Sequence, residues 1–228
     1  MKKSLIALAV AAALVPSLAM AEAGDIVVRL RATHINPDES SNLGQKTDST
    51  YSTHPAASIY GSATADLKVD SNTIPELDLS YYITKNIAAE LILALGSKHD
   101  VSVSPGVAGA KDLGKVNLLP PTLTLQWHFN PDQMIDPYVG AGVTYVRAMD
   151  NGLDYANTYP IRIDRNNWGA ALQAGLDVNL ENRWLVNFDV KKIFVDTDVK
   201  LNLDGSYKKI DSLDIDPWVV SIGFGKKF

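Results

Sequence analysis

The residue types that usually perform catalysis or bind metals are present, but not at the spacing that such chemistry requires. The four histidines are His34, His54, His99 and His128. They form no i,i+4 pair and no H-E-x-x-H motif, so each is expected to be interfacial or solvated. The acidic stretches 196–198 and 211–216 offer oxygen ligands for Ca²⁺ without EF-hand spacing, and the sequence has no G-x-S-x-G, P-loop or Rossmann motif. We therefore expect no enzyme, metal or cofactor; a Ser/His/Asp site built from loops stays an open alternative.

A second set of ionisable residues occupies every second position of apolar segments. Its members are Arg29, Arg31, Glu76, Asp78, Glu90, Asp177, Asp189 and Lys191. In extended strands this alternation places all of them on one face, opposite the apolar residues. Inside a closed lumen these charges can pair with one another and with water, whereas facing lipid each would cost about 2–4 kcal/mol. The predicted chemistry is therefore ion pairing within a barrel.

Composition narrows the class of protein. The chain has 228 residues, of which 46% are hydrophobic and 21% charged, and it has no cysteine. The lack of cysteine excludes a disulfide scaffold, thiol catalysis and thiolate metal sites. A mean hydropathy of −0.02, with no run of eighteen apolar residues, argues against transmembrane helices. A membrane barrel remains possible, because only every second strand residue must be apolar.

The first 21 residues have the pattern of a cleaved signal peptide. Lys2 and Lys3 precede an apolar block from Leu5 to Val15, and an A-x-A site ends at Ala21. Cleavage there leaves one barrel domain, residues 22–228. Without the two lysines, 19 basic residues face 26 acidic ones, a net charge of −7 that argues against a nucleic-acid partner. The mature chain is expected to pass through the periplasm of a Gram-negative bacterium.

Eight segments of the mature chain alternate between apolar and polar residues. They begin near residues 26, 67, 89, 119, 139, 168, 184 and 218. The connections between these segments alternate between long and short. The first is a long polar stretch from Asn36 to Ala65, and the second is a tight turn at 84–86. The later long connections are Ser97 to Leu113, Met149 to Asn166 and Val199 to Asp214. This pattern predicts an all-β, eight-stranded antiparallel up-and-down barrel with short periplasmic turns and long extracellular loops.

Alternation alone does not decide whether the apolar face points outward to lipid or inward to a cavity, as in a lipocalin-like barrel. Aromatic residues near the segment ends favour a membrane barrel, because such residues suit the two interfacial girdles of a bilayer. They are Tyr81, Trp127, Phe129, Trp168, Trp184, Trp218 and Phe228. The charged opposite face and the terminal aromatic residue Phe228, which resembles an outer-membrane insertion signal, favour the same assignment.

Several sequence blocks resemble the outer membrane protein W (OmpW/AlkL) family. They are LPPTL at 119–123 with Gln126-Trp127, DPYVGAG at 136–142, WGAA at 168–171 with Gln173, Gly175 and Asp177, NRWLVN at 182–187 and DPW at 216–218. The resemblance extends from about residue 22 to the end and is weakest in the first long loop. It implies an outer-membrane barrel that admits small hydrophobic molecules, which leave sideways through the barrel wall into the membrane.

Leu119, Pro120 and Pro121 are the candidates for such a lateral portal. Two consecutive prolines remove two backbone donors from a strand, so that strand cannot pair normally; a simple bulge at the rim is the alternative. Ile74, Ile92 and Leu118 fall on the inward parity. They could line a hydrophobic passage together with the ionisable set, or pack to fill the lumen. Lys191 also falls on the inward face at mid-strand, where an apolar or aromatic residue would better suit hydrophobic cargo.

Three functions fit these expectations. The first is a passive channel for small hydrophobic solutes, embedded in outer-membrane lipid and expected to be monomeric. The second is a closed barrel whose extracellular loops act as an adhesin or as a phage or bacteriocin receptor. The third is a periplasmic carrier with an apolar cavity.

Overall fold

The computed structural model describes residues 22–41, 65–94, 96–104, 112–150, 152–155, 159–203 and 205–228. The expected signal peptide (1–21) and most of the expected first loop (Asn36 to Ala65) lie outside these ranges. In the described part of the chain, no helix is long and apolar enough to cross a membrane. A single helical turn, η3 (Glu181–Arg183), connects two of the strands.

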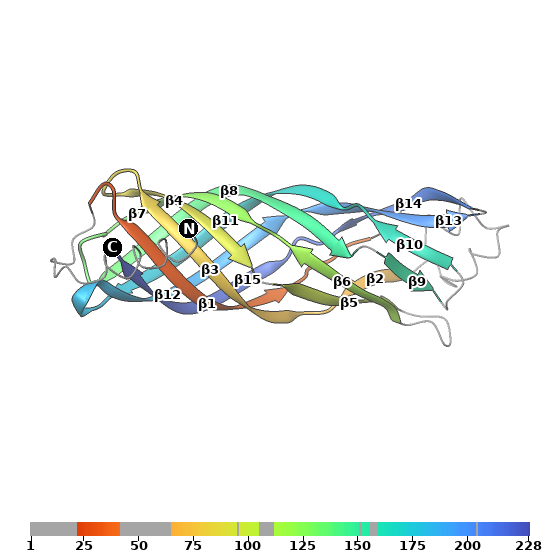
Figure 1. The fold of residues 1–228 in the computed structure, drawn as a ribbon, viewed down its shortest axis with the longest axis horizontal. Helices are drawn as coiled ribbons and strands as arrows, with labels where there is room; N and C mark the ends of the chain where they lie inside the picture. The colour runs from red at the N-terminus through yellow and green to blue at the C-terminus, as the bar shows by residue number, and fades with distance from the viewer. Residues whose placement is uncertain are drawn as a thin grey trace, which may run out of the picture.

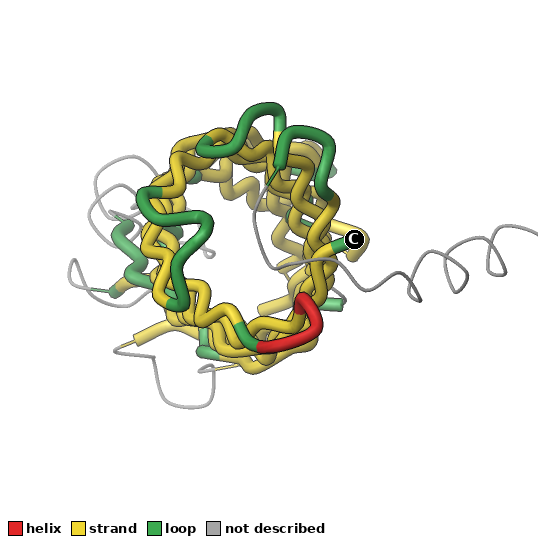
Figure 2. The backbone as a smooth tube through the Cα atoms, turned by 90° about the vertical axis from the view of Figure 1, so that its left-hand side faces the viewer, coloured by secondary structure: helices red, strands yellow, loops and turns green. Residues whose placement is uncertain are grey.

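Eight strands form a closed antiparallel barrel in which each strand pairs with its neighbours in chain order (Figures 1 and 2). They are β1 (Ile26–Asn36), β3 (Asn72–Tyr82), β4 (Ile87–Ala94), β7 (Thr122–His128), β8 (Ile135–Asp150), β11 (Asn166–Asn179), β12 (Trp184–Phe194) and β15 (Trp218–Lys227). Pairing of β1 with β15 closes the ring, and Ile26 and Phe228 exchange backbone hydrogen bonds at one rim. The up-and-down barrel is therefore confirmed, with both termini at the same end.

Further strands lengthen the barrel wall at the end opposite the termini, on the right of Figure 1, and we call this part of the wall the extension. Those that the structure describes are β2 (Asp66–Val69), β5 (Ser97–Ser104), β6 (Asp112–Leu119), β9 (Gly152–Tyr155), β10 (Tyr159–Ile163), β13 (Asp196–Leu203) and β14 (Ser206–Asp214). The long connections expected from Ser97 to Leu113, Met149 to Asn166 and Val199 to Asp214 are found at this end, but their described residues include strands of their own. These connections carry their own alternation, as at Val199 and Leu201, and pair as hairpins.

One of the eight alternating segments, from Leu67 to Ile83, was predicted as a single strand with mostly apolar odd positions, and this is wrong. It contains two strands, because the backbone leaves the ladder between β2 and β3. The two strands therefore differ in parity: Leu67 is buried inside, whereas Leu79 faces outward.

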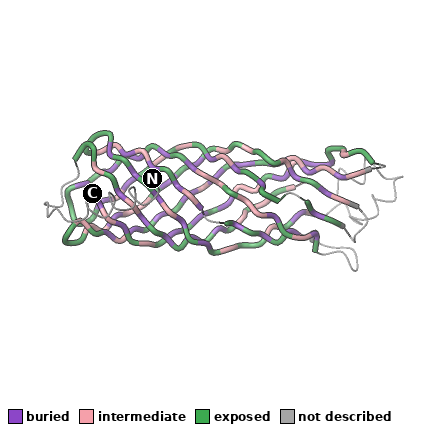
Figure 3. The backbone as a smooth tube through the Cα atoms, viewed as in Figure 1, coloured by how far each residue is buried: buried purple, intermediate pink, exposed green. Residues whose placement is uncertain are grey.

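The two faces of the barrel wall differ as the alternation predicts (Figure 3). Large apolar residues such as Leu125, Phe188 and Ile222 are exposed on the outside, whereas the eight ionisable residues of the alternating set are all buried within. Only hydrocarbon makes such an exterior favourable, since apolar surface in water is costly. The assignment of sides is confirmed: the apolar face is outside and the ionic face is enclosed.

Aromatic side chains lie on the outer face near both ends of the barrel strands. Tyr81, Trp127, Phe129, Trp184 and Phe228 lie near the rim that holds the termini, and Trp168 and Trp218 lie near the opposite end. In all of them except Phe228, which is partly exposed, at least 44% of the residue surface is accessible. At the terminal rim, Lys226 Nζ lies 5.1 Å from the centre of the Trp184 ring, so this cation rests on an aromatic face.

Candidate functional site

The lumen of the barrel is filled at mid-height by a network of ion pairs, which we call the plug. The plug comprises Arg29, Arg31, Glu76, Asp78, Glu90, Asp177, Asp189 and Lys191 with the polar residues Ser80, Gln126, Tyr138, Gln173 and Asn187. Glu90 lies at its centre: one carboxylate oxygen is 3.2 Å from Arg29 Nη1 and 3.0 Å from Arg31 Nη2. Its other oxygen accepts hydrogen bonds from Gln126 at 2.7 Å and Gln173 at 2.8 Å.

The two arginines reach across the lumen because small residues lie beside them. Gly225 and Gly223 are the register partners of Arg29 and Arg31 on β15. A Cβ atom at Gly225 would lie 2.8 Å from Arg29 Cγ, and one at Gly223 would lie 2.9 Å from Arg31 Cγ. Any larger residue would therefore displace the arginine stems. The glycines on the inward face of β15 thus make room for the plug.

Lys191, which looked unfavourable for hydrophobic cargo, belongs to the plug. Its Nζ lies 2.9 Å from Asp189 and 3.2 Å from Glu76. Asp189 also accepts a hydrogen bond of 2.6 Å from Tyr138. Each buried cation of the plug therefore has carboxylate partners, which offset the cost of burying its charge.

A cluster of His128, Asp136 and Asp177 lies at the terminal end of the plug. One ligating nitrogen or oxygen atom of each residue lies within 4.8 Å of those of the other two, and all three residues are buried. The expectation that His128 is interfacial or solvated was therefore wrong. His128 Nδ1 is 2.7 Å from Asp136, while Asp177 binds Arg29 at 2.5 Å and Asn187 at 2.6 Å. These atoms already have protein partners, and the cluster stabilises the plug as it stands.

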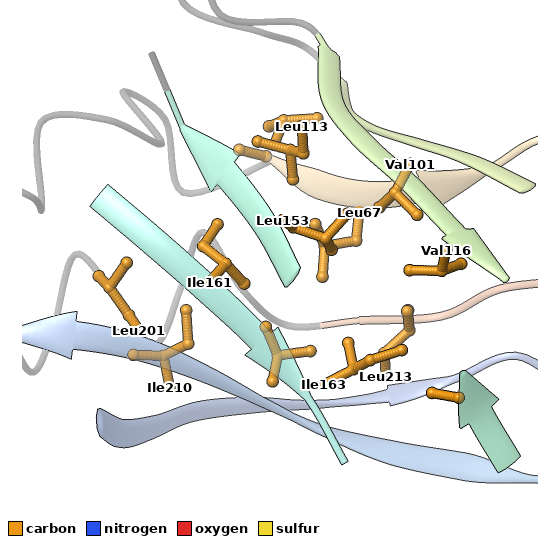
Figure 4. Packing of buried hydrophobic residues seen from close by; sticks show 14 residues of the cluster. Leu67, Val101, Leu113, Val116, Leu153, Ile161, Ile163, Leu201, Ile210 and Leu213 are labelled. Carbon is orange, nitrogen blue, oxygen red and sulfur yellow. The ribbon is translucent and has the colours of Figure 1, made fainter. Parts of the chain in front are cut away.

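An apolar cavity lies between the plug and the far end of the extension. About 80 Å³ of its interior is wide enough to admit the centre of a water-sized molecule, so the cavity is narrow. Its walls combine barrel residues such as Ile35 and Val146 with extension residues such as Leu153 and Leu213. Figure 4 shows the extension side chains that converge on this region. Among the described residues that line it, only Ser97, His99 and Thr197 are polar.

The backbone ladder is interrupted beside this cavity. β4 pairs with β7 as far as Ile92 with Thr122, and pairing is next seen between Ser97 and Leu118 on β5 and β6. Leu119, Pro120 and Pro121 lie between these points and have no ladder partner there among the described residues. On their other side the wall continues, since Tyr145 N donates to Pro121 O at 2.9 Å. Pro120 and Leu118 also line the cavity, so the cavity reaches the interruption.

The remaining inward residues form an apolar layer above the plug. Ile74 is buried in a cluster with Val146, Ile193 and Val219, and Leu118 packs against this cluster. Ile92 is buried on the inner face of β4. The polar plug members Gln126, Tyr138, Gln173 and Asn187 were not among the predicted lumen residues, although all four lie on the inward face of their strands. The apolar residues of the extension were not predicted either, because their alternation was interpreted as loop.

Comparison with known proteins agrees with this geometry. The model of the OmpW family matches residues 22–228. The chain belongs to the OmpW family. Over its whole length it is 33% identical to Outer membrane protein W of Escherichia coli (strain K12), covering 99% of that protein. It is also 29% identical over 74% of its length to 75% of the dibenzothiophene metabolism operon protein PahQ of Pseudomonas aeruginosa.

Solved structures of the OmpW type share the fold. The crystal structure of the outer membrane protein OprG from Pseudomonas aeruginosa superposes with a TM-score of 0.75 at 27% identity, covering 93% of this chain and 99% of that one. The protein is therefore an outer-membrane β-barrel of the OmpW family. The periplasmic rim is the one that carries the termini and the short turns, and the extension is extracellular.

Proposed function

We propose that this protein is a passive channel that admits small hydrophobic molecules across the outer membrane and releases them sideways through the wall near Pro120 and Pro121. The observation that carries the proposal is an apolar cavity that lies above an ion-paired plug and borders an interruption in the strand ladder. A solute entering from outside meets apolar walls first and then a closed axial route. The only low-cost continuation is lateral.

The energetics favour apolar cargo. Each square ångström of apolar solute surface removed from water contributes about 25 cal/mol, whereas a polar solute would lose its hydration against walls that return few hydrogen bonds. Entry into the plug would require breaking buried ion pairs such as Arg29 with Asp177. The name of the relative PahQ is consistent with this cargo class, since dibenzothiophene is an apolar aromatic compound.

Restoring the ladder tests the lateral step. The double variant P120V/P121V supplies two backbone donors and two strand-forming residues, so it should close the wall. In a strain lacking the gene, complementation with this variant should leave naphthalene uptake near that of the deletion strain, while sugar uptake is unchanged. P75V is the matched control, because Pro75 also lies within a barrel strand but does not line the cavity.

Equal naphthalene uptake through P120V/P121V and the unaltered protein, at equal surface levels, would refute lateral exit. Unchanged uptake on deletion of the gene itself would refute the channel. The receptor function remains the alternative prediction. It would be favoured if exchanging the 36–65 segment abolished phage or bacteriocin binding without altering uptake.

A further inference from the structure

Two exposed arginines lie side by side on the outer surface, where the barrel meets the extension. Arg147 on β8 is exposed between the buried residues Val146 and Ala148, so its side chain points away from the lumen. Arg165 is also exposed and does not line the cavity, and its backbone oxygen accepts a hydrogen bond of 2.8 Å from Ala148 N. The two arginines therefore lie at the same height on neighbouring segments of the wall.

Neither arginine side chain has a partner among the described residues. The acidic side chains closest to them in the sequence are engaged elsewhere. Asp164 pairs with Lys200, and Asp150 accepts a hydrogen bond of 3.2 Å from Gly152 N. Because an arginine has five N–H donors and no acceptor, both guanidinium groups are free to bind an anion from outside the chain.

Asn166 adds a donor between the two arginines. It follows Arg165 in the chain and is the register partner of Arg147 on β8. Its side-chain oxygen accepts a hydrogen bond of 2.5 Å from the Tyr145 hydroxyl, and its NH₂ group has no partner among the described residues. Arg147, Arg165 and Asn166, which we call the arginine patch, thus present only free donors to the outside, and charged donors of this kind suit phosphate.

The arginine patch lies at the level of the lipid headgroups. Tyr145 and Trp168 are register partners with ring centres 4.9 Å apart, at the extracellular end of the aromatic belt. Arg147 lies two residues beyond Tyr145 on β8, a step of about 7 Å along the strand. The headgroup layer adds about 5–7 Å on each side of the hydrocarbon core, so the patch lies in the layer that holds lipid phosphates.

From this geometry we propose that the arginine patch binds the phosphate group of an anionic lipid in the outer leaflet of the surrounding membrane. The guanidinium groups and the Asn166 NH₂ group donate to the phosphate oxygens, and the exposed ring of Trp168 packs against an acyl chain of the same lipid. This binding does not depend on the proposed channel. Because Arg147 is also the register partner of Leu119 on β6, the bound lipid lies beside the interruption of the strand ladder.

Quenching by brominated lipids measures lipid binding beside Trp168. The triple variant W127F/W184F/W218F leaves Trp168 as the only tryptophan, and 69% of its surface is exposed. Quenching is followed in phosphatidylcholine vesicles as the mole fraction of brominated phosphatidic acid, or of brominated phosphatidylcholine, rises. Phosphatidic acid should reach half-maximal quenching at the lower mole fraction. That fraction should rise about fivefold in R147Q and about fivefold again in R147Q/R165Q, since each basic residue contributes separately to phosphate binding.

K208Q is the matched control for the loss of charge. Lys208 is exposed on β14, two residues after the strand begins at Ser206 near the tip of the extension. The preference for phosphatidic acid should therefore be unchanged in K208Q.

Equal quenching by the two brominated lipids, or a preference that survives in R147Q/R165Q, would overturn the proposal and leave the channel untouched. An equal loss of preference in K208Q would also overturn it, because the overall charge would then attract the lipid. Inorganic phosphate should compete no better than sodium chloride of the same ionic strength. Stronger competition would show that the patch binds free phosphate and would refute a lipid site.

Discussion

Replacing Glu90 by glutamine should lower the free energy of unfolding substantially, although the two side chains have nearly the same size and shape. Glu90 is fully buried and accepts hydrogen bonds from Arg29, Arg31, Gln126 and Gln173. In E90Q the new amide NH₂ must face two N–H donors in either orientation, and both arginines lose a carboxylate. Breaking a buried ion pair on one side costs about 3–5 kcal/mol, because the remaining charge is left uncompensated.

The assay is urea unfolding of the refolded protein in phosphatidylcholine vesicles, followed by tryptophan fluorescence. With an m-value of about 2 kcal/mol/M, a loss of about 4 kcal/mol lowers the midpoint by about 2 M urea. E39Q is the matched control, since Glu39 pairs with the half-exposed Lys68 and such pairs contribute less than about 1 kcal/mol. A midpoint for E90Q within the range of E39Q would refute the view that ion pairs hold the plug together.

Two further changes test other parts of the structure. G175A places a Cβ against the buried ring of Tyr138, so it should lower the free energy of unfolding by about 1–3 kcal/mol, measured in the same urea assay; full stability would show that Tyr138 does not cross the lumen there. In the extension, a hydrogen bond from Lys209 lowers the pKa of Asp198 below its ordinary value of 3.8. Because the folded pKa is the lower one, the stabilisation is present above pH 3.8 and is lost as the pH falls through the folded value. Amide exchange in β13 and β14 should therefore accelerate under acid in the unaltered protein but not in D198N; equal acceleration in both would exclude this ion pair as the cause.

Much of the barrel could be predicted from the sequence because its signal is local. A period of two at Leu123 and Leu125 against Thr124 and Gln126 identifies a strand and its two faces without knowledge of any partner. The same reasoning identified the inward charges and the unusual Pro120-Pro121 pair. These features depend on a few neighbouring residues, so one sequence is sufficient.

The plug and the cavity could not be predicted in the same way, because they join residues that are remote in the chain. Arg29 pairs with Asp177 across 148 positions, and that contact depends on the register of several strands together. His128 appeared isolated, yet barrel closure places it against Asp136 and near Asp177. The hairpins of the extension were interpreted as loops because their alternation is short and interrupted. Its apolar face can be recognised only from contacts between remote residues, such as Leu153 and Leu213, which are buried in one cluster.

The most direct test of lateral release is to map where a hydrophobic solute lies inside the barrel. A diazirine-bearing apolar probe, photolysed with the protein in vesicles and analysed by mass spectrometry, labels the residues that it contacts. Inward-facing labels should fall on cavity residues such as Val116, Leu118 and Pro120, and none on the plug residues Gln126 and Gln173. Labelling of the plug or of His128 near the periplasmic rim would show axial passage and contradict exit through the wall.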